Sequence, residues 1–382
     1  MNVSFDVLSI LTEKKTGIGY YTEYLIKEII RKYPNNSYTL DFFTLKEDNV
    51  RFVSGFLRDN VKANACKWFK SYWYKLLRPI LPLPYALFFG KTSDVYVFCN
   101  YYVPPFVPGK KILVIHDLAF RDLPETVNIK TKSALRMFLR KSLKYADVII
   151  TVSDFTKERL FHYYPFVKDK RVHAVHSGVD AEKFYSKGNA DEERTRVKNK
   201  YKISGEYFIY LGTLEPRKNL PNLIKAYSSF ISKAAKINAP KLVIAGGKGW
   251  LYDEIFTAVK RLQLENNIIF TGYVDENDVA PLIKGAIAFC FAALYEGFGL
   301  PVLEAMACGT AVITSNVSSL PEVAGDAALL VDPLNADDIA SGLAKLYYDS
   351  EYRQKLIAKG YERVKLFSWE NTAEKFVSHF SA

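Results

Sequence analysis

The block YEGFGLPVLEAMACG carries two glutamates, Glu296 and Glu304, whose carboxylates could contact a ligand. Pro301 suits the first turn of a helix and Gly309 suits the residue just after one. The block therefore predicts a short helix whose N-terminus points at the EGFG loop. Glu304 then lies on this helix among apolar side chains, where a carboxylate needs hydrogen-bond donors. Sugar hydroxyls are suitable donors, and the alternative is a structural glutamate paired with the backbone.

Two adjacent cations, Arg217 and Lys218, form a second candidate site in the stretch YLGTLEPRKN. They follow a predicted strand and Gly212, and they stand at the mouth of the next predicted helix. Two fixed positive charges beside a helix N-terminus suit a diphosphate, and a solvated basic turn is the alternative. Gly246 opens a further glycine turn after the next predicted strand, where the backbone can approach a ligand closely.

The first half of the chain offers two further candidates. Gly17 and Gly19 lie between a predicted strand and a predicted helix, where a glycine loop lets backbone N–H groups approach an anion. An ordinary turn explains the same glycines. His116 follows the apolar run ILVI, at the carboxyl end of a predicted strand where α/β folds collect functional groups. A structural histidine is equally consistent with this position.

The elements that must position these residues alternate between short apolar runs and amphipathic helical stretches. This alternation is typical of α/β domains built on parallel sheets. The run KGNADEERTRVKNK has only one large apolar side chain, which predicts an exposed connection between two doubly wound halves. We therefore expect an N-terminal domain over residues 1–186, a linker over 187–200, a C-terminal domain over 201–362 and a terminal segment over 363–382.

Charge is distributed unevenly along the 382 residues, whose net charge is +11. Residues 1–200 carry 34 basic and 21 acidic side chains, whereas residues 201–382 carry 18 and 20. This excess suggests an anionic partner for the first half, whether nucleic acid, a membrane surface or a phosphorylated substrate. No recognition helix, RNP-like motif or zinc spacing supports nucleic acid. Four cysteines without paired spacing, together with no signal-peptide pattern and no long apolar run, predict a cytoplasmic protein.

The segment over residues 66–91, CKWFKSYWYKLLRPILPLPYALFFGK, interleaves five Lys or Arg with aromatic side chains and has no acid. Basic and aromatic side chains together are what an interfacial segment uses on an anionic bilayer. The alternative is that the rings belong to the core of the first domain and the lysines to its solvated face. Its cations are Lys67, Lys70, Lys75, Arg78 and Lys91.

With these motifs in view, the sequence resembles the retaining, GT-B-fold glycosyltransferases of family 4. The resemblance covers nearly the whole chain and is most specific in the EGFG block with its two glutamates. It extends to the motifs GIG, HD, VSDFT, HSGVDAEKF, YLGTLEPRKN, LVIAGG, SSLPEVAGDAALLVDP and FSWENTA. The GTLEPRKN turn is similar to that of the mannosyltransferase branch.

The resemblance implies two Rossmann-like domains that face each other across a cleft, with a last helix that crosses back to the first domain. It implies that Arg217 and Lys218 hold the diphosphate of a nucleotide sugar and that Glu304 accepts the ribose hydroxyls. His116 would line the sugar site. Glu296 and the backbone of Gly297, Phe298 and Gly299 would meet the transferred sugar, and Gly17 and Gly19 would border the donor phosphates or the acceptor. The remaining donor contacts would come from Gly212, Gly246 and Leu300. Many members carry Arg where this chain has Thr213, which puts the division of phosphate contacts in doubt.

The function that the resemblance implies is transfer of a hexose, by preference mannose from GDP-mannose, to a lipid-linked or saccharide acceptor in surface polysaccharide synthesis. The enzyme would need no metal, because side-chain cations neutralise the diphosphate. It would work at the cytoplasmic face of the membrane. A UDP-sugar donor and a catalytically silent partner subunit are the alternatives.

Overall fold

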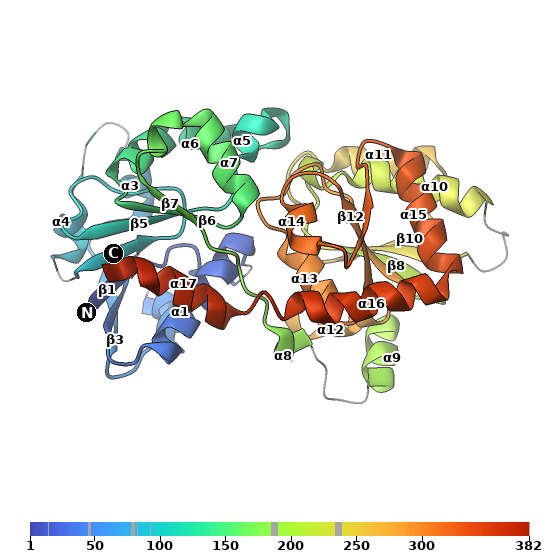
Figure 1. Cartoon of the computed structure of the whole chain (residues 1–382), viewed down its shortest axis with the longest axis horizontal. Coiled ribbons are helices and arrows are strands. Elements are labelled where there is room, and N and C mark those ends of the chain that lie inside the picture. The colour runs from blue at the N-terminus through green and yellow to red at the C-terminus, as the bar shows by residue number, and fades with distance from the viewer. Residues whose placement is uncertain are drawn as a thin grey trace. The chain divides into compact units, whose positions relative to one another are not determined.

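The computed structural model describes residues 1–13, 15–44, 47–77, 81, 83–91, 93–184, 190–233 and 239–381. The chain forms two compact units (Figure 1). The N-terminal unit contains Met1–Arg121, Ile129–Gly178 and Trp369–Ala382, and the C-terminal unit contains Asp122–Asn128 and Val179–Ser368. The terminal segment thus returns to the unit in which the chain begins.

The N-terminal unit is built on a parallel sheet of seven described strands in the order β3-β2-β1-β4-β5-β6-β7. Its central strands read as continuous apolar runs because helices cover both faces of the sheet. The strands are β1 (Asn2–Asp6), β2 (Ser37–Phe43), β3 (Val61–Cys66), β4 (Val95–Phe98), β5 (Lys110–Ile115), β6 (Val148–Thr151) and β7 (Arg171–Ala174).

The helices of this unit are α1 (Gly17–Lys32), α2 (Arg51–Ser54), α3 (Ser71–Leu77), α4 (Tyr85–Phe89), α5 (Ala119–Asp122), α6 (Ile129–Tyr145), α7 (Asp154–Tyr163) and α17 (Trp369–Ser381). The last of these, α17, packs on α1, where Trp369 stacks on Tyr24 with ring centroids 5.5 Å apart. Lys32 on α1 also forms ion pairs with Glu370 and Glu374 on α17. Apolar stacking and charge together attach the end of the chain to its beginning.

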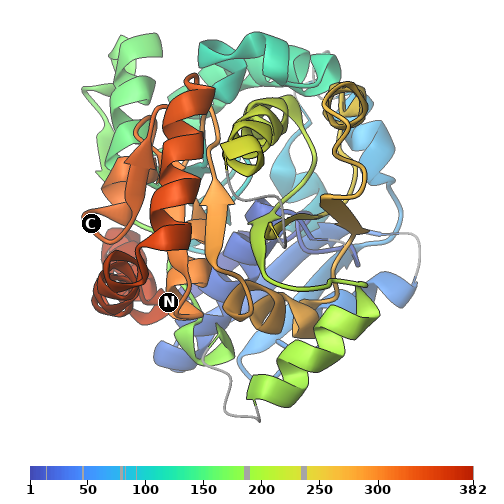
Figure 2. The same cartoon turned by 90° about the vertical axis from the view of Figure 1, so that its right-hand side faces the viewer.

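The C-terminal unit is built on a second parallel sheet, in the order β10-β9-β8-β11-β12-β13. Its strands are β8 (Tyr207–Leu211), β9 (Lys241–Ala245), β10 (Ile268–Gly272), β11 (Ala288–Phe291), β12 (Ala311–Ser315) and β13 (Leu329–Val331). Its helices are α8 (Ala181–Phe184), α9 (Ala190–Lys200), α10 (Leu220–Lys233), α11 (Asp253–Arg261), α12 (Glu276–Lys284), α13 (Leu300–Ala307), α14 (Leu320–Ala324), α15 (Ala336–Tyr348) and α16 (Ser350–Val364). Figure 2 faces this unit.

Each sheet reverses its winding direction once. The chain lays down β1 to β3 in one direction and returns to place β4 beside β1. It does the same in the second sheet, where β11 returns to lie beside β8. Open α/β sheets bind ligands at the carboxyl ends of the strands that flank such a switch point. The fold therefore confirms the predicted fold class, two Rossmann-like doubly wound units, and it marks one candidate site in each.

Much of the segment expected to be an exposed connection, 187–200, is instead the helix α9, which packs on α12 (Figure 2). Asp278 on α12 is 2% exposed and accepts hydrogen bonds from Arg196 at 2.7 Å and from Tyr201 at 2.8 Å. Lys200 completes this network with a 2.5 Å contact to the same carboxylate. Composition alone suggested a solvated connection because α9 has one large apolar side chain, the buried Val197, and its other contacts with α12 are made by charged side chains.

Candidate active site

The site in the C-terminal unit lies at the carboxyl ends of β8 and β11, which pair in parallel. The loop after β8 leads into a 3-10 turn, Pro216–Lys218, that carries the two predicted cations. Asn219 ends this turn with a left-handed backbone (φ 60°), and its side-chain amide donates to Ala292 O at 3.0 Å, just past β11. The amide of Leu294 donates to Arg217 O at 2.9 Å. These bonds attach the turn to the loop after β11.

Glu296 joins the two cations. Arg217 Nη1 lies 3.2 Å from one of its carboxylate oxygens, and Lys218 Nζ donates to the other. Arg217 also donates to Tyr295 O at 2.9 Å and to Glu215 Oε1 at 2.8 Å. The structure thus brings together three side chains that the sequence analysis assigned to different parts of a nucleotide sugar.

The electrostatics of this group follow from burial and pairing. Glu296 is 8% exposed, and burial by itself raises the pKa of its carboxyl. The nearby charges of Arg217 and Lys218 outweigh burial and lower the pKa below its usual value, so the carboxylate is ionised at neutral pH. Lys218 has three N–H donors, and one bond to Glu296 leaves two that can meet a ligand. Its ammonium also lies 5.1 Å from the centroid of the Phe291 ring.

The EGFG loop is held by two serines for which the sequence analysis predicted no role. Ser318 Oγ accepts from the Glu296 amide at 3.1 Å. Ser319 Oγ lies 2.9 Å from the carbonyl oxygens of both Glu296 and Phe298, which share its single hydroxyl hydrogen. These serines belong to the SSLPEV motif. The motif was recognisable in the sequence, but its contact with the EGFG loop was not. Their bonds fix the loop that presents Glu296.

Gly297, Phe298, Gly299 and Leu300 connect Glu296 to α13. Gly299 stands at the N-cap of α13 with φ 103°, a left-handed backbone that glycine adopts without strain. Leu300 then begins the helix, close to the predicted start at Pro301. The four residues therefore form the turn that leads from Glu296 into the N-terminus of α13.

Glu304 lies one turn further along α13 and is partly buried. Burial raises the pKa of its carboxyl to about 7, an effect that the charge of Glu276 increases and that of Lys183 opposes. Within the described ranges of the chain, no group hydrogen-bonds to this carboxyl. The structural alternative, a glutamate paired with the backbone, therefore has no partner among these residues. A partly buried carboxyl without a partner is the kind of group that a ligand hydroxyl can satisfy.

Gly212 and Gly246 end the neighbouring strands β8 and β9. A Cβ placed on Gly246 would lie 1.9 Å from the carbonyl oxygen of Gly212, so the two strand ends approach each other too closely for a side chain. Close packing of the backbone therefore accounts for Gly246. Its predicted contact with a donor stays a prediction.

Gly17, Gly19 and His116 belong to the N-terminal unit. Gly17 begins α1, so both glycines lie in the first helical turn. A Cβ on Gly19 would lie 2.8 Å from Ser9 O, whereas one on Gly17 would meet nothing within 4 Å. Packing against the preceding loop explains Gly19, and the space at Gly17 remains open.

His116 stands after β5, and its Nε2 lies 2.8 Å from the carbonyl oxygen of Cys99, which follows β4. A carbonyl can only accept, so Nε2 carries the hydrogen. Burial lowers the pKa of the ring, which keeps it neutral at pH 7 and leaves Nδ1 as an acceptor. The Tyr21 ring lies edge-on to the imidazole, with centroids 4.9 Å apart. Contacts from α1 and β4 thus fix both the orientation and the tautomer of His116.

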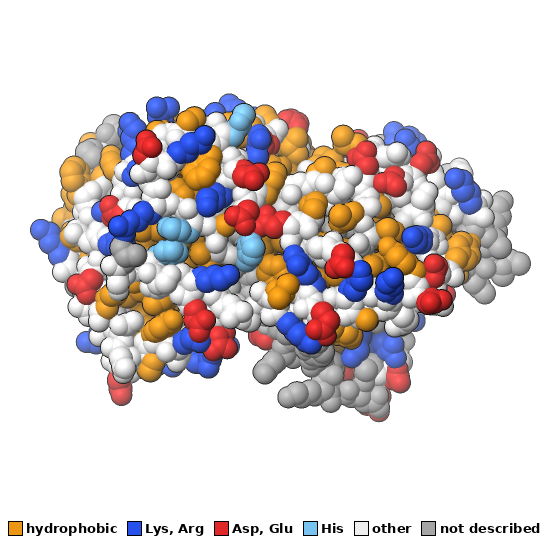
Figure 3. All heavy atoms as spheres, viewed as in Figure 1, with side chains coloured by type: hydrophobic (Ala, Val, Ile, Leu, Met, Phe, Trp, Pro, Cys, Tyr) orange, Lys and Arg blue, Asp and Glu red, His pale blue; other side chains and the backbone are white. Residues whose placement is uncertain are grey.

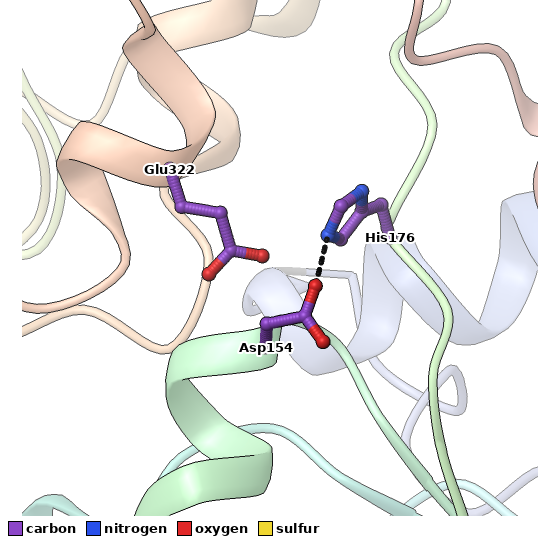
Figure 4. Close-up of side chains that lie close together, drawn as sticks. All are labelled: Asp154, His176 and Glu322. Atoms are coloured by element: carbon purple, nitrogen blue, oxygen red, sulfur yellow. Dashed lines mark ion pairs between the residues drawn. The ribbon is translucent and has the colours of Figure 1, made fainter.

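The HSGVD motif contributes His176 to the same unit. Its Nε2 lies 3.8 Å from Asp154 Oδ2 at the start of α7, an ion pair when the ring is protonated (Figure 4). Its backbone carbonyl accepts from Thr372 on α17 at 2.8 Å. Glu322, the third side chain in the figure, belongs to the C-terminal unit.

Comparison with known proteins identifies the family. Residues 191–363 match the family described as "Glycosyl transferases group 1", and residues 18–183 match "Glycosyltransferase Family 4". The "O-antigen chain mannosyltransferase B" of Escherichia coli is 33% identical over 282 residues, which cover 74% of this chain and 72% of that protein. The "Serotype-specific mannosyltransferase WbdA" of the same species is 30% identical over 278 residues, which cover 72% of this chain but 34% of that protein.

Solved structures share the fold. Sucrose-phosphate synthase from Thermosynechococcus elongatus matches with a TM-score of 0.75 and 18% identity, over 100% of this chain and 98% of that one. HepE from Anabaena, in complex with UDP and glucose, matches with a TM-score of 0.73 and 14% identity, over 100% and 99% of the two chains. The chain belongs to the family 4 glycosyltransferases of the GT-B fold, in the mannosyltransferase-like branch, and is a hexosyltransferase.

Proposed function

We propose that this enzyme transfers mannose from GDP-mannose, with retention of anomeric configuration, to a lipid-linked or saccharide acceptor in surface polysaccharide synthesis. The names of both relatives, which are mannosyltransferases, support the sugar, and the name of the first, an O-antigen chain mannosyltransferase, supports the pathway. The main observation in support of a donor site here concerns Glu304, which lies on the helix that follows Glu296. Its carboxyl is partly buried and has no hydrogen-bond partner among the described residues.

In the proposed reaction, the bond between the anomeric carbon and the diphosphate oxygen breaks, and GDP leaves with the bonding electrons. The acceptor hydroxyl oxygen forms the new bond on the same face of the sugar, and its proton passes to a phosphate oxygen. Arg217 and Lys218 stabilise the negative charge that grows on the diphosphate. Glu296 holds these two cations in position. Glu304 accepts hydrogen bonds from the ribose hydroxyls.

For His116 the proposal assigns a hydrogen bond with the transferred sugar. Because Nε2 already donates to Cys99 O, the nitrogen that is left for a ligand is Nδ1, an acceptor. A sugar hydroxyl is a suitable donor to it. The amides of Gly299 and Leu300, at the N-terminus of α13, supply further donors.

A thermal-shift titration with GDP, UDP, ADP and their sugars tests the donor. We expect a guanine nucleotide to stabilise the protein most, by about 2.7 kcal/mol at 100 times its dissociation constant.

Glu304→Ala should keep the unfolding temperature of the wild type when no ligand is present. It should need about tenfold or more GDP for the same thermal shift, because it loses a charged hydrogen bond to the ligand. Glu265→Ala, which changes an exposed glutamate of the same unit, is the matched control.

Two results would contradict the proposal in different ways. A clear preference for a uridine nucleotide would replace GDP-mannose with a UDP-sugar and leave the site intact. The absence of any shift with every nucleotide would favour the catalytically silent subunit.

We also propose that residues 66–91 contact the membrane. Some aromatic side chains of this segment are buried and others are exposed. Tyr74, Phe88 and Phe89 are buried, so the core accounts for them. Exposed apolar surface remains on Trp68 (62%), Tyr72 (65%) and Trp73 (47%), which supports an interfacial role. Arg78 lies outside the described residues, as does the side chain of Lys75. No described helix has the length and hydropathy required to cross a bilayer.

A further inference from the structure

Helix α6 has a charge pattern that the proposed transfer reaction does not use. Its sequence, IKTKSALRMFLRKSLKY, contains six Lys or Arg and no Asp or Glu. The helix is amphipathic, because Leu139 and Leu143 are completely buried while the opposite side is solvent-exposed. Ser142 Oγ accepts from the Val103 amide at 3.1 Å and so fixes which side faces inward.

The exposed side of α6 combines uncompensated cations with apolar side chains. Arg136, Lys141 and Lys144 are exposed and form no ion pair within the part of the chain that the structure describes. Ile129 is 64% exposed and Met137 is 56% exposed on the same helix. Figure 3 shows Lys and Arg side chains along the upper edge of the N-terminal unit, where Figure 1 places α6.

Helix α6 adjoins the segment over residues 66–91 through one side chain, Tyr102. The Tyr102 ring lies edge-on to Tyr74 on α3, with centroids 6.5 Å apart. It lies edge-on to Phe138 on α6 as well, with centroids 5.7 Å apart. Helices α3 and α6 therefore flank the same side chain, so they are neighbours in the N-terminal unit.

We propose that the outer side of α6 is a docking surface for an anionic lipid bilayer. Cations along one side of a helix attract anionic headgroups, and each contributes about 1 kcal/mol near the surface, or about fivefold in partitioning. Exposed Ile129 and Met137 add apolar area that can enter the headgroup boundary, a feature that a soluble polyanion would not require. This surface goes beyond the proposed reaction and does not depend on the identity of the donor.

The test measures sedimentation of the full chain with vesicles of equal parts phosphatidylglycerol and phosphatidylcholine, and with vesicles of phosphatidylcholine alone. We expect binding to the anionic vesicles that weakens with salt, because surface charges are screened over about 10 Å at 0.1 M. The triple variant Arg136→Gln, Lys141→Gln, Lys144→Gln should lower the partition coefficient at least tenfold. The matched control, Lys225→Gln, Arg261→Gln, Lys355→Gln, removes the same number and types of exposed cations from the C-terminal unit and should bind as wild type does.

Thermal unfolding and the nucleotide shift of each variant, measured without vesicles, separate this proposal from the proposed function. A second variant, Trp68→Ser with Trp73→Ser, tests α3 and the loop that precedes it. Loss of binding in both variants assigns the bilayer contact to α6 together with α3 and its preceding loop. The proposal for α6 is overturned if its triple variant binds as wild type does, if wild type does not bind anionic vesicles, or if binding to phosphatidylcholine alone is equally strong.

Discussion

Glu296 is the residue on which the charges of the candidate active site converge. It accepts from Arg217 and Lys218 at once, and Glu215 holds the far side of the Arg217 guanidinium. Rigid placement of cations matters for catalysis, because donors that are already in position need not reorganise when charge develops on a leaving group. A buried carboxylate that orients two cations supplies such rigidity.

Lys218 gives the residue-scale prediction. Lys218→Ala should lower turnover by about 100-fold or more, the usual cost of losing one donor to a developing anion. The variant should still fold, because Arg217 remains paired with Glu296 and the buried carboxylate keeps a partner. Turnover per folded molecule, with unfolding temperature measured in parallel, checks both statements.

Lys225→Ala, on the exposed side of α10, is the control for this change and should affect neither quantity. Near-normal turnover in folded Lys218→Ala would show that the lysine serves the structure alone. If Lys218→Ala unfolds at the assay temperature, the ion pair between Lys218 and Glu296 is required for the fold, which again gives Lys218 a structural role.

At the scale of elements, α9 shows how a strongly polar segment can be attached to a domain. The helix places Arg196 and Lys200 beside Asp278 of α12, and its cations remain nearly half exposed while the carboxylate is buried. Acidic residues in the first turn and lysines in the last complement the helix dipole. Charge pairing to one buried acid therefore supplements the small apolar contact that the buried Val197 makes.

The stability of this attachment should depend on pH. Burial alone would raise the pKa of Asp278, but hydrogen bonds from Lys200, Tyr201 and Arg196 outweigh it and lower the pKa. A carboxyl whose folded pKa lies below its unfolded value, about 3.9, stabilises the protein above that pH. The stabilisation is lost as the pH falls through the folded pKa. Asp278→Asn should lower the free energy of unfolding by about 1–3 kcal/mol at pH 7.

Denaturant unfolding from pH 7 to pH 3 tests this dependence. The difference in free energy of unfolding between wild type and Asp278→Asn should become smaller below about pH 4. Asp275→Asn, which changes an exposed partner of Lys200, should cost less than about 1 kcal/mol at any pH. If this difference in free energy of unfolding stays constant with pH, or if Asp278→Asn is as stable as wild type, the role given to the Asp278 carboxylate is contradicted.

At the scale of the whole molecule, two Rossmann-like units carry different charge. The basic excess lies in the first half of the chain, which forms most of the N-terminal unit, whereas the second half is close to neutral. Such a division suits a C-terminal unit that holds a nucleotide with a few fixed cations and an N-terminal unit that meets an anionic surface.

Side-chain cations lead to a prediction about metals. Because Arg217 and Lys218 are proposed to neutralise the diphosphate, transfer should proceed at an unchanged rate in excess EDTA. The measurement is initial velocity with chelator, with and without added Mg²⁺ or Mn²⁺. Loss of transfer on chelation, with recovery on adding either ion, would show that a metal supplies this charge.

Local residue patterns determined much of what can be said about this protein. Apolar runs that alternate with amphipathic stretches predicted the two parallel-sheet units, because a buried parallel strand must be apolar on both faces. Pro301 and Gly309 predicted α13 to within a residue or two, since both act on the backbone near their own positions. Arg217 and Lys218 were adjacent in sequence, and Glu296 and Glu304 were in one motif, so each pair was visible locally.

Only the tertiary structure decided which of these groups meet. Glu296 reaches Arg217 and Lys218 because β11 returns to pair with β8, and strand order is set by packing between distant segments. The same dependence on distant partners explains the tautomer of His116, which the Cys99 carbonyl fixes from a neighbouring strand. It explains the aromatic segment too: Tyr74 is buried while Trp73 beside it is exposed, because burial is set by the surface on which α3 packs and not by the type of side chain.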